Sequence, residues 1–83
     1  MKLLYFAWVR QMIGRSEETV DPPARVKTAG DLVAWLVSRG EGYAAALGDT
    51  KRVRVAINQE HASLAESVGP DDEVAFFPPV TGG

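Results

Sequence analysis

The chain ends in the run Glu73-Val74-Ala75-Phe76-Phe77-Pro78-Pro79-Val80-Thr81-Gly82-Gly83. The apolar residues before the prolines predict a strand, and because alternate strand residues point to opposite faces, one of Phe76 and Phe77 lies away from the core. Two prolines then end the strand, since proline has no N–H for the next ladder bond. The sequence therefore predicts a domain over residues 1–77 and a C-terminal tail over residues 78–83.

The tail is predicted to work as a thin probe. It has six residues and reaches roughly 20 Å when extended, at about 3.3–3.6 Å per residue. Its last two residues are glycines without a Cβ, so the terminal carboxylate can enter a narrow channel in another protein. ATP can convert that carboxylate to an acyl-adenylate, which a sulfur or nitrogen nucleophile then attacks. The alternative is that Gly82-Gly83 is an ordinary frayed terminus.

The rest of the chain predicts an α+β domain, with one main helix packed on one face of a mixed sheet. The expected elements are strands over residues 2–10, 17–20, 53–57 and 61–64, a helix from an N-cap at Thr28 to a C′ glycine at Gly40, and a short helical turn over residues 43–47. Within residues 2–10, the side chains on both faces of the predicted strand are apolar. One face is predicted to be an interaction surface, or its apolar side chains are ordinary exposed residues at the rim of the core.

Composition narrows the function classes. The net charge is −2 with a pI near 5.2, and no basic patch appears, which argues against nucleic acid and anionic membranes as partners. No apolar run approaches the roughly 20 residues needed to span a bilayer, and the N-terminus is too short and too regular for a signal peptide, so a cytoplasmic protein is expected.

Catalytic and metal-binding side chains are not expected. The chain has no cysteine and one histidine, His61, which is predicted to be a surface or rim residue. Glu17 and Glu18 point to opposite faces of a strand and are predicted to lie on a solvated edge. The acidic run Asp71-Asp72-Glu73 is interpreted as a solvated loop in preference to a metal site. No permanently bound cofactor is expected.

The run from Asp72 to Gly83 resembles the C-terminus of the small subunits of molybdopterin synthase, a family of ubiquitin-like sulfur carriers. Leu4-Tyr5-Phe6-Ala7 with Arg10, and Val55-Ala56-Ile57-Asn58-Gln59-Glu60, are similar to the same family, so the resemblance covers essentially the whole chain. It implies the β-grasp, or ubiquitin-like, fold, in which the first and last strands lie side by side and parallel.

The resemblance also implies a mechanism. A ubiquitin-activating-type adenylyltransferase and sulfurtransferase would use ATP to adenylate Gly83 and convert it to a thiocarboxylate, which would donate sulfur to cyclic pyranopterin monophosphate to form the molybdopterin dithiolene. The large synthase subunit would supply the catalytic side chains in a heterotetramer of two small and two large subunits. Partner contact is implied for Phe6 and Phe77. The residues implied to enter the large subunit's active site are Pro78, Pro79, Val80, Thr81 and Gly82, ahead of Gly83.

Three other readings stay open. The first is a sulfur carrier for another pathway, such as thiamine synthesis or tRNA thiolation. The run Phe76-Phe77-Pro78-Pro79 disfavours the thiamine type. A ubiquitin-like protein modifier would instead join its terminal glycine to lysine in an isopeptide bond. A β-grasp interaction module without either chemistry is the third.

Overall fold

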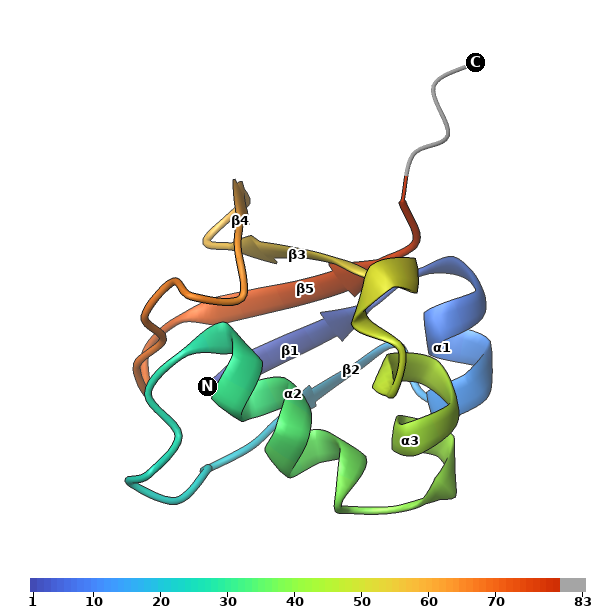
Figure 1. Cartoon of the computed structure of the whole chain (residues 1–83), viewed down its shortest axis with the longest axis horizontal. Helices are drawn as coiled ribbons and strands as arrows, with labels where there is room; N and C mark the ends of the chain where they lie inside the picture. The colour runs from blue at the N-terminus through green and yellow to red at the C-terminus, as the bar shows by residue number, and fades with distance from the viewer. Residues whose placement is uncertain (80–83) are drawn as a thin grey trace.

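The computed structural model describes residues 1–79, and its elements form an α+β domain (Figure 1). They follow in the order β1 (Lys2–Tyr5), α1 (Ala7–Ile13), β2 (Glu17–Thr19), α2 (Ala29–Val37), α3 (Glu41–Leu47), the 3-10 turn η1 (Thr50–Arg52), β3 (Arg54–Ile57), β4 (Glu60–Ala62) and β5 (Glu73–Phe77). Within the described residues, none of the helices has the length and apolar character needed to cross a membrane.

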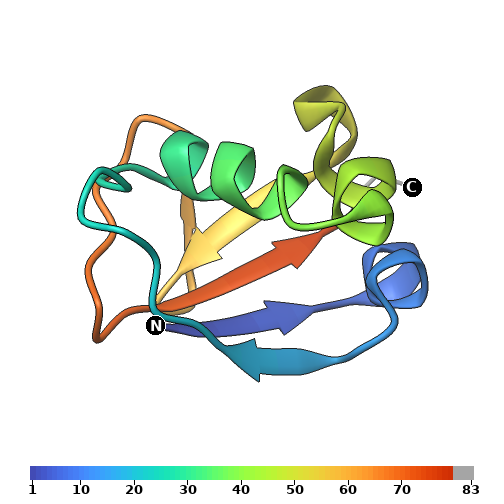
Figure 2. The ribbon, with the colours of Figure 1, turned by 90° about the horizontal axis from the view of Figure 1, so that it is seen from below.

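The five strands form one mixed sheet in the order β2-β1-β5-β3-β4. β1 and β5 run parallel, with Leu3 opposite Val74 and Tyr5 opposite Phe76, while the other neighbours are antiparallel. The side-by-side parallel arrangement of the first and last strands is therefore confirmed. Because β5 is the central strand, it ends between β1 and β3 (Figures 1 and 2).

The core lies between the sheet and α2. This helix begins at the predicted N-cap, where the Thr28 side chain accepts the Asp31 N–H at 3.1 Å and the Asp31 carboxylate accepts the Thr28 N–H at 3.1 Å. This reciprocal capping box fixes where the helix starts. Leu32 and Leu36, one turn apart, are fully buried against the strands.

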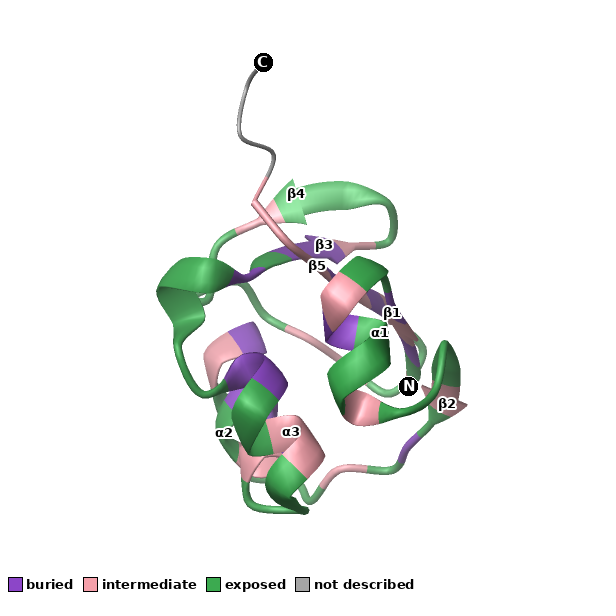
Figure 3. Ribbon diagram, turned by 90° about the vertical axis from the view of Figure 1, so that its right-hand side faces the viewer, coloured by how far each residue is buried: buried purple, intermediate pink, exposed green. Residues whose placement is uncertain are grey.

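Alternation along the two central parallel strands divides core from surface as predicted. Leu3, Val74 and Phe76 are fully buried and Tyr5 nearly so, while Phe77 is only half-buried. The Tyr5 and Phe76 rings stack with their centroids 6.0 Å apart. The buried residues, purple in Figure 3, lie on the strands of the sheet and on the helices packed against it. Phe76 is thus the core phenylalanine and Phe77 the outward one.

The predicted strand over residues 2–10 is wrong beyond Tyr5. The chain turns at Ala7, whose φ of 53° lies in the left-handed region, and continues as α1. That conformation costs an alanine about 1–2 kcal/mol, so local sequence gives no signal for the turn. Val9 becomes a fully buried residue of the helix. A short run that is apolar at nearly every position fits a buried strand and a packed helix equally well.

Gly40 does not end the main helix as predicted. The cap of α2 is Ser38, and Gly40 is the extended N-cap of α3, with φ of 162°. The glycine that matters for packing is Gly42. A Cβ at Gly42 would lie 2.7 Å from the Met12 carbonyl oxygen, so this position lets α1 and α3 approach each other closely.

The return strand after β3 is Glu60–Ala62, not residues 61–64. Asn58 and Gln59 both have positive φ, 50° and 70°, the pattern of a two-residue type I′ hairpin turn, so the new strand starts at once. The Asn58 side chain also accepts the Glu73 N–H at 3.0 Å and donates to Asp72 at 2.9 Å. The hairpin turn is thereby tied to the start of β5.

The prediction that Glu18 lies on a solvated edge is wrong. Its side chain is only 6% exposed, and its carboxylate accepts hydrogen bonds from the Tyr5 hydroxyl at 2.7 Å and the Tyr43 hydroxyl at 2.6 Å. Arg15 and Arg39 form ion pairs with it at 3.3 and 3.4 Å. The carboxylate therefore joins β1, β2 and α3. Apart from Arg15, its partners lie 13, 21 and 25 residues away in the sequence, so spacing alone could not identify them.

Two opposing effects set the pKa of Glu18. Burial raises it, but the hydrogen bonds from Tyr43 and Tyr5 and the charges of Arg15 and Arg39 outweigh burial and hold the pKa below its usual range. The same contacts act in reverse on the phenols. Burial, followed by the hydrogen bond to Glu18, raises the pKa of Tyr5 and Tyr43. The cluster is built around a charged carboxylate.

Glu18→Gln is expected to destabilise the domain by about 1.5–3 kcal/mol at pH 7, the range for hydrogen bonds to a buried charged group. Because folding lowers the pKa of Glu18, its contribution is present above the unfolded value near 4.3 and is lost as the pH falls through the folded value. The free energies of unfolding in urea of the wild type and of Glu18→Gln should therefore converge below about pH 4.

Glu17→Gln is the matched control for this prediction. Glu17 is 57% exposed and pairs with Lys2 at 3.4 Å, so its loss should change stability by less than about 0.5 kcal/mol. Equal effects of the two substitutions would show that the Glu18 cluster does not stabilise the fold.

Candidate functional site

The sheet face turned away from α2 is left uncovered by the helices, and we call it the open face (Figure 2). Alternation places on it Leu4 of β1, Phe6 just after that strand, and Ala75 and Phe77 of β5. Phe6 is 49% exposed, the highest fraction of any large apolar side chain among residues 1–79. Leu4, Ala75 and Phe77 are half-buried. The open face is therefore an apolar surface on a small domain, the kind of surface that marks an interaction site.

The two predicted contact residues lie near the point where β5 ends. The Phe6 N–H donates to the Phe76 carbonyl at 3.1 Å, which extends the β1–β5 ladder by one residue and holds Phe6 beside the end of β5. Phe77 is the last residue of that strand and is followed by the half-buried Pro78 and Pro79. The fold thus brings Phe6, from the start of the chain, to the start of the tail.

Polar residues border the open face next to Phe77. The ring of His61 on β4 meets the Phe77 ring edge-on with centroids 5.4 Å apart, and its exposed position agrees with the predicted rim location. Arg54 on β3 is the residue in register with Phe77. Alternation with the buried Val53 and Val55 places Arg54 on the non-core side of its strand, but only the strand order brings it to the end of β5.

The predicted reactive end of the chain lies outside the described residues. That applies to Gly83, the carboxylate carrier, and to Gly82, Thr81 and Val80 before it. Of the six predicted tail residues, the structure describes Pro78 and Pro79.

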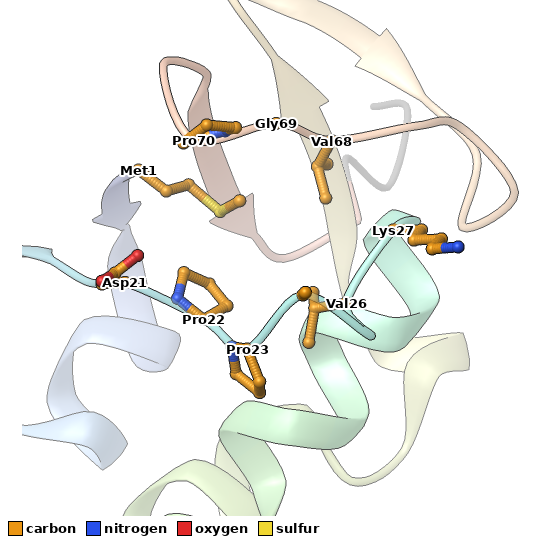
Figure 4. A pocket seen from close by; sticks show the side chains of 10 residues that line it. Met1, Asp21, Pro22, Pro23, Val26, Lys27, Val68, Gly69 and Pro70 are labelled. Carbon is orange, nitrogen blue, oxygen red and sulfur yellow. The ribbon is translucent and has the colours of Figure 1, made fainter.

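A separate groove lies at the opposite end of the molecule (Figure 4). It has a volume of about 530 Å³ and is lined mainly by small apolar and proline side chains, with Asp21 and Lys27 as its charged residues. Met1 forms part of its wall, and β1 starts there beside the start of β5, so the groove is remote from the end of β5. No polar side chains converge in it, and we assign it no chemistry.

Among residues 1–79, no three His, Asp or Glu side chains come together in an arrangement that would hold a metal ion. The acidic run before β5 has a local structural role instead. The Asp72 carboxylate accepts the Gly69 N–H at 2.7 Å, and the hydrogen bond from Asn58, followed by that from Gly69, holds its pKa below the usual range. Asp72 therefore shapes the turn into β5.

Comparisons with known proteins place the chain in a family. Residues 3–83 match the ThiS family. The chain is 37% identical over 83 residues to the molybdopterin synthase sulfur carrier subunits of Escherichia coli (strain K12) and Haemophilus influenzae. Each alignment covers 100% of this chain and 99% of the relative. The crystal structure of SAMP1, a small archaeal modifier protein from Haloferax volcanii, superposes with a TM-score of 0.78 at 32% identity, covering 100% of this chain and 98% of that one.

Proposed function

Since this chain belongs to the ThiS family, we propose that it is the sulfur carrier subunit of a molybdopterin synthase, with Gly83 carrying the sulfur as a thiocarboxylate. The observation that carries the proposal is the full-length similarity to two sulfur carrier subunits, which includes the Gly82-Gly83 end. The fold is consistent with it, because the central strand β5 ends at the apolar open face and leads directly into the tail.

The proposed chemistry takes place at the terminal carboxylate. An ATP-dependent enzyme of the ubiquitin-activating type forms the Gly83 acyl-adenylate with release of pyrophosphate, and a sulfur nucleophile displaces AMP to leave the thiocarboxylate. The thiocarboxylate is anionic at neutral pH, and its soft sulfur is a better nucleophile toward carbon than a carboxylate oxygen. The sulfur bonds to a carbon of cyclic pyranopterin monophosphate, and water then cleaves the acyl–sulfur bond, which leaves the sulfur on the pterin and returns Gly83 as a carboxylate. Two such deliveries supply the two sulfurs of the molybdopterin dithiolene.

In the proposed reaction this chain supplies the tail that carries the sulfur and the surface that binds the large subunit. Phe6 and Phe77 on the open face contact the large synthase subunit, in an assembly of two small and two large subunits. The prolines Pro78 and Pro79 restrict the chain to extended conformations, which lowers the entropy lost when the tail enters the partner's active site. Catalytic side chains belong to the large subunit. ATP is used by the activating enzyme, in the cytoplasm, and is not a resident cofactor of this chain.

Mass spectrometry of the C-terminal peptide tests the proposal. The protein is incubated with ATP, its activating enzyme and a sulfur donor, and we expect a fraction with one oxygen of Gly83 replaced by sulfur. Omitting ATP should remove that fraction, which controls for adventitious sulfur. A C-terminus that stays a plain carboxylate under complete conditions would contradict the carrier chemistry.

A second candidate function has its own supporting observation. The superposition on a small archaeal modifier protein favours a ubiquitin-like role, in which Gly83 forms an isopeptide bond with lysines of other proteins. Lysine-linked adducts of this chain in extracts of its native cells would support that role. Sulfur-substituted Gly83 without lysine adducts would support the carrier.

A further inference from the structure

Three cationic residues lie close together in the sequence, on η1 and at the start of β3, and the last of them is next to the end of β5. Lys51 and Arg52 belong to η1, which leads directly into β3, and Arg54 is in register with Phe77 at the end of β5. All three residues are exposed. We call Lys51, Arg52 and Arg54 the basic collar. In Figure 1, η1 is the yellow turn on the same side of the molecule as the end of β5 and the start of α1.

The collar is positioned by the fold but is not neutralised by it. The Arg52 guanidinium lies over the Trp8 ring at 5.0 Å, which connects η1 to α1. Arg54 donates to the backbone carbonyls of Lys51 and Val53 at 3.5 and 3.4 Å. Within residues 1–79, none of the three cations forms an ion pair with a carboxylate. The neighbouring Asp49 instead accepts the Lys51 backbone N–H, at 3.1 Å.

Acidic residues gather at the other end of the same strands. Asp71, Asp72 and Glu73 lie at the start of β5, and Glu60 is opposite Ile57 at the far end of β3 from Arg54. The chain as a whole carries a net charge of −2. Lys2, which is in register with Glu73, partly offsets these carboxylates, whereas none of the collar cations pairs with a carboxylate within residues 1–79.

From this arrangement we propose that the basic collar steers the chain tail-first onto an acidic surface around the opening in the large subunit that receives the tail. The inference rests on the proposed function. An exposed patch of unpaired cations is attracted to a negative surface before contact, and charges at the rim of an interface raise the association rate more than the affinity. Orientation is valuable here, because only the tail end of the molecule can make the productive complex.

The collar differs from a nucleic-acid or phosphate site. Three cations on a chain of net charge −2 provide no extended basic surface for a polyanion. Arg54 is in register with Phe77, and an extended tail would carry Gly83 roughly 20 Å beyond that residue, at roughly 3.3–3.6 Å per residue. The collar side chains cannot reach a phosphate bound near the reactive carboxylate, so they act on the partner's outer surface.

Association kinetics with the large subunit of the same organism test the inference. In the double variant Lys51→Gln, Arg54→Gln, we expect the association rate constant to fall about tenfold at low ionic strength, with a small change in the dissociation rate constant. The difference should disappear near 0.5 M salt, where the screening length is only a few ångströms. Circular dichroism melting should confirm that the variant is folded.

The matched control is Arg25→Gln, Lys27→Gln, which removes the same charge from the exposed loop between β2 and α2. That loop follows the end of β2 at Thr19, opposite Lys2, and so lies at the far end of the molecule from the collar. The control should associate at the wild-type rate. Equal rate losses in both variants, or none in the collar variant, would overturn the inference while leaving the carrier function standing. A wild-type chain that does not bind the large subunit would overturn both.

Discussion

A chain that lacks Gly83 is expected to lose sulfur delivery completely while unfolding with the same free energy as the full-length protein. In the proposed mechanism the reacting atom is the sulfur of the terminal thiocarboxylate, and shortening the tail by one residue withdraws it by about 3.3–3.6 Å. A displacement of even about 1 Å from reactive geometry can cost a hundredfold in rate. The fold should be unaffected, because the core ends at Phe76.

Molybdopterin formation by the reconstituted synthase measures this effect, and urea unfolding measures stability. A variant with one residue added after Gly83 is the control for length, because it keeps every native residue yet blocks the native carboxylate. It should be equally inactive. Sulfur transfer by either variant at the wild-type rate would contradict the assignment of Gly83 as the carrier.

Alanine at Phe76 and alanine at Phe77 are expected to have opposite consequences, although the residues are adjacent in the chain. Phe76 is fully buried and stacks on Tyr5, so Phe76→Ala should destabilise the domain by about 3–5 kcal/mol, the range for removing a core phenylalanine. For a domain of this size that is a large part of the total stability. Thermal or urea unfolding will measure it.

Phe77→Ala should instead weaken binding to the large subunit by about 2 kcal/mol or more, as expected for an aromatic hot spot, with a small change in stability. The Phe77 side chain is half-buried on the open face and contacts His61. Calorimetric titration of the folded variant against the large subunit measures the loss. Near-wild-type affinity would remove Phe77 from the interface, and a loss of stability equal to that of Phe76→Ala would show that it belongs to the core.

The sequence by itself determined the elements whose signals are local. The capping box at Thr28 and Asp31 needs only residues three apart, and the strand over residues 73–77 is bounded by an acidic turn and two prolines. Period-two alternation then separated Phe76 from Phe77. The role proposed for the terminal carboxylate likewise comes from the sequence alone, because it depends on two terminal glycines without side chains.

Only the tertiary structure decided features built from distant residues. Ala7 holds a left-handed conformation that nothing in its own side chain favours, so the turn from β1 into α1 reflects the packing of the domain around it. Glu18 is buried because Tyr5, Tyr43 and Arg39 reach it from other elements. Arg54 lies beside Phe77 because the order β1-β5-β3 puts them in register. Such contacts join residues far apart in the chain, whereas sequence patterns report on near neighbours.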